Sequence, residues 1–249
     1  MNKLHPLIEL QTVDSTNFYA EELLKTQKVS EGTIIFAHDQ TSGKGQGENN
    51  WESEPRKNVT FSLVLFPKFL SPWQQFLLNK AISLGVLDFL AGVIIEQKLS
   101  IKWPNDIYAG NRKIGGILLQ NTICGTLYES CIAGIGVNLN QETYNPGLPN
   151  PVSLRQITGK DYPVKDAVDR IVACIDDRYQ QLQEGLSELL DREYREQLFG
   201  INEWRDYTVD KNLIKGKIRG VDESGMLIME TENGSIRHFN HREIAFVFH

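Results

Sequence analysis

The spacing of apolar residues changes once along the chain, and this change limits the folds open to it. Between about residues 7 and 198, segments that alternate apolar and polar residues, as strands do, are interleaved with segments of helical spacing. Residues 204–249 contain only short strand-like segments separated by turn residues. With 249 residues and 41% hydrophobic composition, the chain can form one large unit and one small one. We therefore predict two domains, a mixed α/β domain at 1–203 and a small antiparallel sheet or barrel at 204–249.

Within the larger unit, the elements can be placed from caps and periodicity. A helix is predicted to begin at Asp14-Ser15-Thr16-Asn17, where cap-forming residues precede a run with helical spacing. Strands are predicted at 33–37 and 59–66, the second with one apolar and one mixed face, and helices at 72–91 and 164–198. Four further strands form a predicted antiparallel meander, at 100–103, 107–108, 113–119 and 126–139.

Composition excludes several classes of protein. The net charge of −6 argues against a non-specific nucleic-acid binder. The apolar stretches are too short to cross a bilayer, and MNKLHPLIEL lacks a signal-peptide core, so we expect a cytoplasmic protein without membrane contact. Cys124, Cys131 and Cys174 lie in apolar sequence, which predicts buried thiols rather than disulfides or a metal cluster.

A long polar loop, QTSGKGQGENNWESEPRKN, follows the strand at 33–37. It fits neither the Walker pattern nor the dinucleotide fingerprint, and a glycine-rich loop by itself is most often flexible surface. Trp51 ends the glycine-rich part, and the strand at 59–66 follows at the end of the loop. The loop is therefore also consistent with a flap that closes over a ligand and excludes water.

Two lysines flank one predicted hairpin, in IKWPNDIYAGNRKIGG at residues 101–116. Such a hairpin can be an ordinary turn with lysines extended into solvent. However, Gly115 and Gly116 would weaken a strand unless a ligand or another backbone approaches closely. Lys102 and Lys113 near a cleft would suit an anionic ligand. The strand AGIGVNLN at 133–140 also combines glycines with terminal amides.

Together, these segments resemble biotin protein ligases. The matching pieces, in order, are DSTN (14–17), QTSGKGQ (40–46), Trp51, KWPND (102–106), RKIGGIL (112–118) and GIGVNLN (134–140). The resemblance implies a mixed β-sheet with packed helices, like that of class II aminoacyl-tRNA synthetases, followed by a small SH3-like barrel. It also implies a two-step reaction in which biotin and ATP form biotinyl-5′-AMP, and biotin then passes to a lysine of a biotin carboxyl carrier domain.

The resemblance further assigns roles to residues. Lys113 is expected to offset charge at the biotin carboxylate and the α-phosphate, and magnesium to be held mainly through phosphates, without a certain protein ligand. The residues expected at the biotin side are Ser15, Thr16, Asn17, Gln40, Lys44, Gly45, Gln46, Gly115 and Gly116. Those expected at the ATP side are Gly43, Trp51, Lys102, Asn105, Asp106, Asn138 and Asn140.

The sequence departs from the family pattern in two places. Many relatives carry Gly-Arg-Gly-Arg-Arg-Gly-Arg before the tryptophan, whereas this chain has Lys44, Gln46, Gly47, Glu48 and Asn49. We expect such a flap to retain the adenylate less firmly, because charge-assisted bonds to the phosphate are lost. No segment before Met1 could form a DNA-binding winged helix, so a ligase without repressor activity is expected.

Two other functions remain open at this stage. A lipoate or octanoate ligase would share the fold and the chemistry but would need a long apolar channel more than the polar set of 14–17 and Gln40. A non-enzymatic nucleotide- or RNA-binding module would use the C-terminal barrel, whose near-neutral charge and few aromatic residues argue against it. An exposed sheet edge in the meander could also pair across a homodimer.

Overall fold

The larger of two β-sheets carries the site. The computed structural model describes residues 5–47 and 49–248. The strands of the larger sheet are β1 (Leu7–Leu10), β2 (Ile34–Ala37), β3 (Val59–Leu65), β4 (Leu99–Lys102), β5 (Asp106–Ala109), β6 (Arg112–Cys124) and β7 (Leu127–Val137). Their order is β1-β2-β3-β7-β6-β5-β4. β1 and β2 run parallel, whereas the other neighbouring pairs among these strands are antiparallel. The predicted mixed sheet and its antiparallel meander are confirmed.

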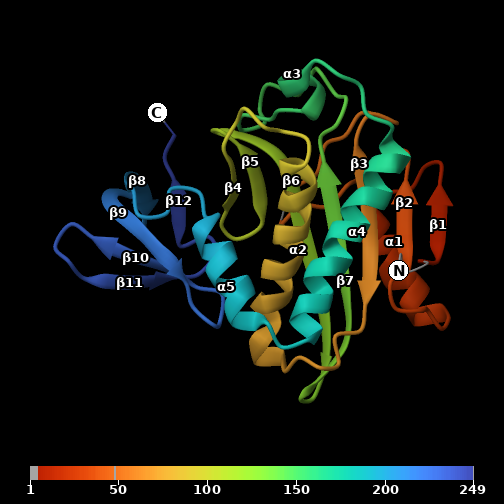
Figure 1. The fold of residues 1–249 in the computed structure, drawn as a ribbon, viewed down its shortest axis with the longest axis horizontal. Coiled ribbons are helices and arrows are strands. Elements are labelled where there is room, and N and C mark those ends of the chain that lie inside the picture. The colour runs from red at the N-terminus through yellow and green to blue at the C-terminus, as the bar shows by residue number, and fades with distance from the viewer. Residues whose placement is uncertain (1–4, 48, 249) are drawn as a thin grey trace.

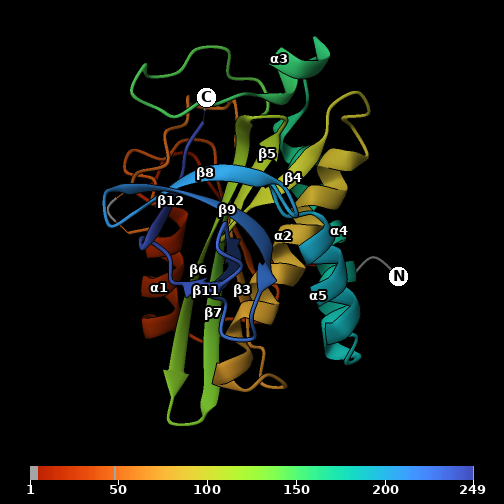
Figure 2. The ribbon, with the colours of Figure 1, turned by 90° about the vertical axis from the view of Figure 1, so that its left-hand side faces the viewer.

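Helices cover the two faces of this sheet unequally. The helical segments are α1 (Thr16–Thr26), η1 (Pro72–Gln74), α2 (Gln75–Ala91), α3 (Leu154–Thr158), α4 (Val164–Gln183) and α5 (Ser187–Glu196). Figure 1 shows α2, α4 and α5 in front of the sheet and α1 behind it, and Figure 2 shows the sheet between these two layers. Among the helices in residues 5–47 and 49–248, α1 is the one that lies on the rear face.

The side chains of β3 point alternately to the two faces of the sheet, so this strand packs against both helical layers. Val59, Phe61 and Leu63 are fully buried in the large apolar core that also contains α2 and α4. Val64 points to the other face, where it packs with Ala20 of α1. Thr60 and Ser62, on that second face, are also buried and hydrogen-bonded. The predicted division into an apolar and a mixed face is therefore confirmed.

A second, antiparallel sheet follows at the C-terminus and lies beside the β4–β5 end of the larger one (Figure 1). Its strands are β8 (Trp204–Val209), β9 (Asn212–Val221), β10 (Leu227–Thr231), β11 (Ile236–Phe239) and β12 (Ile244–Phe246), in the order β11-β10-β9-β8-β12. The indole N–H of Trp103, in the KWPND segment, donates to the carbonyl of Gly225 at 3.0 Å. The rings of Tyr108, Phe199 and Phe248 also meet at this junction.

Some expectations differ from the structure. β6 continues to Cys124 instead of ending near 119, so the β6–β7 hairpin protrudes past the neighbouring strands (Figure 2). Cys124 is consequently exposed, and the prediction that it is buried was wrong, whereas Cys131 is buried. Strand β8 and the short helix α3 were not predicted. In the part of the chain that the structure describes, no helix has the length and apolar character that a bilayer crossing requires.

The close packing of α2 on α4 leads to a stability prediction. A Cβ atom added at Gly85 of α2 would lie 2.7 Å from Cα of Ile175 on α4, too close to be accommodated without moving the backbone. Overpacking costs about 1–3 kcal/mol, more than the roughly 1 kcal/mol that alanine gains over glycine from helix propensity. We expect Gly85→Ala to lower the free energy of unfolding in urea. Gly92→Ala, at the end of the same helix with only ordinary contacts, is the control, and a stability at or above wild type for Gly85→Ala would contradict this packing.

Candidate active site

A cavity of about 690 Å³ opens on the α1 face of the larger sheet and extends to the C-terminal sheet. All but three of the residues predicted for the site line it. Those that do are Ser15, Thr16, Asn17, Gln40, Lys44, Gly45, Gln46, Trp51, Lys102, Asn105, Asp106, Lys113, Gly116 and Asn138. The three that do not are Gly43, Gly115 and Asn140.

The register of the strands explains why distant residues meet here. Lys102, Asp106, Gly116 and Gly136 are successive cross-strand partners on β4, β5, β6 and β7. Directly opposed residues in antiparallel strands point to the same face, so this row places two charges next to two glycines. In a second row, Leu118 of β6 and Ser62 of β3 flank Gly134 of β7. Each row has a glycine on β7, which lets other groups approach the sheet.

One end of the cavity is a closed polar network around α1. Thr16 donates from its backbone N–H and its hydroxyl to Oε1 of Gln40, at 2.8 and 3.0 Å. Asn17 donates from Nδ2 to Oε1 of Gln120 at 2.7 Å, and its side chain occupies the space above Gly134. The hydroxyl of Ser62 lies 2.8 Å from Oγ1 of Thr16 and 2.6 Å from Oδ1 of Asn17. These bonds fix the orientation of each side chain.

Some hydrogen-bonding capacity at this end stays unused. Ser15 is 2% exposed and is the N-cap residue of α1, yet its hydroxyl does not cap the helix. Gln40 uses its oxygen for Thr16, and no bond joins its Nε2 to another described residue. A donor and a hydroxyl that can both donate and accept are thus available to a polar ligand group.

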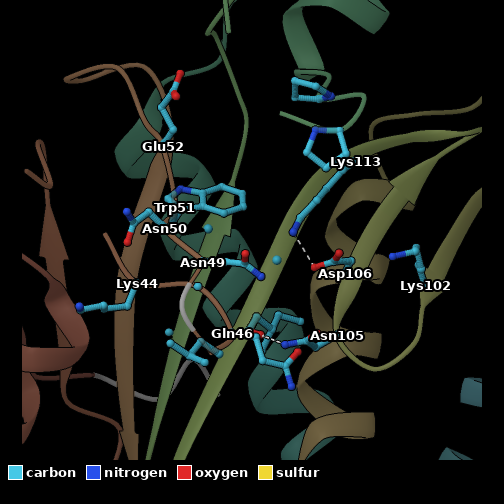
Figure 3. Close-up of a pocket in the computed structure, with 18 of the residues that line it drawn as sticks. Lys44, Gln46, Asn49, Asn50, Trp51, Glu52, Lys102, Asn105, Asp106 and Lys113 are labelled. Carbon is cyan, nitrogen blue, oxygen red and sulfur yellow. Dashed lines mark hydrogen bonds and ion pairs between the residues drawn. The ribbon is translucent and has the colours of Figure 1, made fainter. Parts of the chain in front are cut away.

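Trp51 lies in the slot made by the paired glycines. A Cβ atom added at Gly136 would lie 2.4 Å from Cε2 of the indole, and one at Gly116 would lie 3.3 Å from Cζ3. The indole Nε1 is buried and has no hydrogen-bond partner in the described structure. A buried unpaired N–H costs free energy, so a ligand that accepts this bond would be favoured. Figure 3 shows the ring beside Lys113, whose Nζ lies 5.8 Å from the ring centroid.

Lys113 and Asp106 form the charged centre of the cavity. Nζ of Lys113 lies 2.6 Å from Oδ1 of Asp106, and both side chains are about a quarter exposed. Lys102 lies over the rings of Tyr108 and Phe246. Burial lowers the pKa of Lys102, opposed by the negative charge of Asp106 and reinforced by the positive charge of Lys113. An anionic ligand beside Lys102 would raise this pKa again and favour the charged form of the lysine.

The predicted flap is a small hairpin over the cavity. The N–H of Trp51 donates to the carbonyl of Gly43 at 2.9 Å, and that of Gly45 donates to the carbonyl of Asn49 at 2.8 Å. Lys44 is exposed and points away from the Lys113–Asp106 pair (Figure 3). Glu48 lies outside the described residues. From here on, the flap means residues 43–47 and 49–51.

The asparagines differ in what they contact. Asn105 donates to the carbonyl of Ile117, and Asn138 donates from Nδ2 to the carbonyl of Val152 at 3.1 Å. Asn140 instead exchanges two hydrogen bonds with the backbone of Tyr162, away from the cavity. Asn140 thus braces the chain before α4 in this structure.

The other two predicted residues outside the cavity lining are glycines. Gly115 is buried against β5 and β7, and Gly43 packs beneath Trp51.

Several residues in the cavity wall or directly behind it were not identified from the sequence. Gly134 and Gly136 belong to a segment that was singled out, but their side-chain neighbours could not be inferred from it. Gln120 and Ser62 carry no local motif, and only the register brings them to α1. The loop after β7 and the C-terminal strand β12 also contribute, through Tyr144, Leu148, Pro149, Pro151, His241, Ile244, Ala245, Phe246 and Phe248.

A metal ion would need oxygen ligands here. Among the described residues, no group of three or more His, Cys, Asp or Glu side chains is arranged to hold one. Asp106 offers a carboxylate, and Asn138 uses its amide nitrogen rather than its oxygen for the bond to Val152. These donors fit a magnesium ion that is carried mainly by nucleotide phosphates.

Comparison with known families agrees with this geometry. Residues 9–138 match the model of the "Biotin/lipoate A/B protein ligase family", and residues 208–247 match the "Biotin protein ligase C terminal domain". The chain belongs to the biotin/lipoate A/B protein ligase family. It is therefore a ligase with the fold of that family.

Individual relatives are similar over most of their length. The bifunctional ligase/repressor BirA of Bacillus subtilis is 30% identical over 239 residues, which cover 92% of this chain and 70% of that protein. A biotin–[acetyl-CoA-carboxylase] ligase of Paracoccus denitrificans is 29% identical over 174 residues, covering 64% of this chain and 67% of the relative. The solved structure of the Aquifex aeolicus biotin protein ligase in complex with biotin and ATP superposes with a TM-score of 0.80 at 29% identity, covering 96% and 97% of the two chains.

The slot for Trp51 leads to a prediction about activity. Gly136→Ala would place a methyl group inside the space of the indole and displace it from the cavity. Because displacements of about 1 Å near a reacting centre cost roughly a hundredfold in rate, we expect ligase activity to fall by about that factor while the protein stays folded.

Two further variants test that explanation. Gly147→Ala, which lines the same cavity with an ordinary 3.5 Å contact, should have little effect. In a Trp51→Ala background, Gly136→Ala should cost little more, because the ring it displaces is absent. Equal losses in both backgrounds would exclude the slot as the cause.

Proposed function

We propose that this protein activates biotin with ATP to give biotinyl-5′-AMP and then transfers the biotinyl group to a lysine of a carrier domain. The observation that carries this proposal is the closed polar end of the cavity around α1. Its support from outside the chain is the fold shared with the Aquifex aeolicus enzyme in complex with biotin and ATP.

The polar end suits the ureido ring of biotin better than an acyl tail. A ureido group has one carbonyl acceptor and two N–H donors within one small ring. The unused Nε2 of Gln40 can donate to such a carbonyl, and the hydroxyl of Ser15 can donate or accept. The network of Thr16 and Asn17 holds these groups in place. Lipoate or octanoate would leave them unpaired, at a cost of about 1–3 kcal/mol for each buried group.

The charged centre can perform the first step. The biotin carboxylate attacks the α-phosphate of ATP, so two anions must approach each other, and pyrophosphate leaves. Lys113 is the cation for this encounter, since it lies in the cavity between Trp51 and Asp106. Asp106 orients the ammonium group in the absence of substrate. Magnesium, carried on the phosphates, would supply further positive charge near Asp106 and Asn138.

In the second step, a neutral lysine amine of the carrier attacks the carbonyl of the mixed anhydride. The new amide bond forms as the bond to the phosphate breaks, AMP leaves and the amine loses a proton. The partner is thus a biotin carboxyl carrier domain of a carboxylase, in line with the name of the Paracoccus denitrificans relative. The cytoplasmic location, the lack of DNA binding, the homodimer through a sheet edge and the domain division at 203/204 stay predictions.

The first test is exchange of labelled pyrophosphate into ATP by the purified protein. We expect exchange that requires biotin, because adenylation is reversible and needs the bound carboxylate. Parallel reactions contain lipoate or no acid. Exchange with lipoate but not with biotin would move the protein to the lipoate branch of the family, and no exchange with either acid would contradict adenylation altogether.

Lys113→Ala tests the role of the cation. We expect adenylation to slow by several powers of ten with an unchanged fold, because positioned charge at a reacting centre is worth about 3–4 kcal/mol or more. Arg112→Ala is the matched control, since Arg112 is an exposed cation next to it on β6 that does not line the cavity. The readouts are single-turnover formation of biotinyl-adenylate and circular dichroism. A near-normal rate for Lys113→Ala would remove Lys113 from the chemistry.

A further inference from the structure

One turn of the larger sheet, between β4 and β5, leads directly into the charged centre of the cavity. Its three residues, Trp103, Pro104 and Asn105, line the cavity together with Asp106, the first residue of β5. The carboxylate of Asp106 points toward Nζ of Lys113, 2.6 Å away (Figure 3). The position of this turn therefore determines where the carboxylate of the charged centre lies.

A buried tyrosine behind the cavity wall is bonded to the backbone of this turn. The hydroxyl of Tyr194, on α5, donates to the carbonyl of Pro104 at 2.9 Å. Tyr194 is 1% exposed and is not one of the residues that line the cavity. Burial raises the pKa of Tyr194, so the hydroxyl keeps its proton and acts as the donor. Without this hydroxyl, the carbonyl of Pro104 would lose a donor on the buried side of the turn.

The surroundings of Tyr194 hold its ring in register with the turn. The segment that follows α5 pairs with β4, since the N–H of Ile101 donates to the carbonyl of Gln197 at 2.8 Å and that of Phe199 donates to the carbonyl of Ile101 at 2.9 Å. The ring of Phe76, on α2, packs edge to face with that of Tyr194, with the two centroids 5.7 Å apart. The hydroxyl is thus presented to the turn from a fixed position.

The chain between Pro104 and Asp106 can transmit this restraint. Asn105 exchanges two hydrogen bonds with Ile117 of β6: its side chain donates to the carbonyl of Ile117, and its own carbonyl accepts from that residue's N–H at 3.1 Å. Because a peptide unit is planar and rigid, a change in the direction of the Pro104 carbonyl would also turn the N–H of Asn105. Asp106 follows directly, so its carboxylate would lose its alignment with Lys113.

We propose that Tyr194 is a positioning residue for adenylation, which acts through the carbonyl of Pro104 to keep Asp106 aligned with Lys113. The inference rests on the proposed function and assigns to α5 a part in the chemical step. A small displacement of a positioned group slows the reaction even where substrates still bind. The polar end of the cavity is built around α1, so binding of biotin should not depend on Tyr194.

The experiment compares Tyr194→Phe, which removes the hydroxyl and keeps the ring, with the wild type. We expect single-turnover formation of biotinyl-adenylate at saturating biotin and ATP to slow about tenfold, with the Kd for biotin within twofold of wild type. Tyr179→Phe is the matched control. It removes a similarly buried hydroxyl, which donates to Oε1 of Glu31 at 2.8 Å, and neither of these residues lines the cavity. This control should keep the wild-type rate, and circular dichroism checks that both variants are folded.

A double-mutant cycle distinguishes positioning of Asp106 from a general loosening of the fold. In an Asp106→Ala background, Tyr194→Phe should slow adenylation by less than about threefold, because the carboxylate that it positions is absent. A general loosening would instead lower the rate by the same factor in both backgrounds.

Hydrogen exchange gives a readout that does not depend on activity. The backbone amides of residues 102–108 should exchange faster in Tyr194→Phe than in the wild type, because the turn has lost one of its restraints. Tyr179→Phe should leave the exchange of this segment unchanged.

The outcomes separate this inference from the proposed function. The role of Tyr194 would be overturned by a rate within twofold of wild type in Tyr194→Phe, by an equal loss in Tyr179→Phe, or by a full tenfold loss in the Asp106→Ala background. A Tyr194→Phe protein that does not fold would assign the bond to stability and would also overturn it. If the wild type forms no adenylate, the proposed function fails, and the exchange experiment then decides on Tyr194: identical exchange in wild type and Tyr194→Phe would count against it.

Discussion

The packing of Trp51 against a pair of opposed glycines determines how the rest of the site is arranged. Gly116 and Gly136 are cross-strand partners, and neither has a side chain on the face where the indole lies. The ring can therefore contact the sheet itself, which anchors the end of the flap and divides the cavity into a polar end and a charged end. Lys113 is held beside this ring by Asp106. Substrates that react with each other would thus meet at the indole.

The charged end depends on a second set of contacts, between the two sheets. The KWPND segment carries Asn105 and Asp106 at its end, and its tryptophan donates to the carbonyl of Gly225 in the C-terminal sheet. Gly225 itself has no room for a side chain, because Phe76 of α2 lies 2.6 Å from where its Cβ would be. The hydroxyl of Tyr194 on α5 holds the carbonyl of Pro104. The C-terminal sheet is thus part of the support of the active-site residues.

Features of the fold that depend only on residues close together in the chain could be predicted from the sequence. Cap residues and alternation predicted α1 and β3, and the glycines of RKIGG and GIGVN indicated close approach to the sheet. The partner of that approach could not be predicted: Gly116 accommodates an indole from 65 residues earlier in the chain, a fact of register rather than of pattern. The same limit applies to Gln120, which reaches Asn17 only across strands. Asn140 and Gly115 belong to recognisable motifs, yet one braces a loop and the other faces the core. A motif defines a stretch of backbone, whereas the direction of each side chain depends on the fold.

The C-terminal sheet has a consequence for how the molecule responds to ligand. His241 and Phe246 line the cavity together with residues of the larger sheet, and Arg242 packs on the backbone of Gly47 in the flap. A ligand in the cavity would therefore contact two parts of the chain. Because a ligand stabilises whichever state binds it, nucleotide binding would also favour the docked position of the C-terminal sheet. The same docking supports KWPND through Trp103, so closure of the flap and orientation of Asp106 would be coupled through one shared interface.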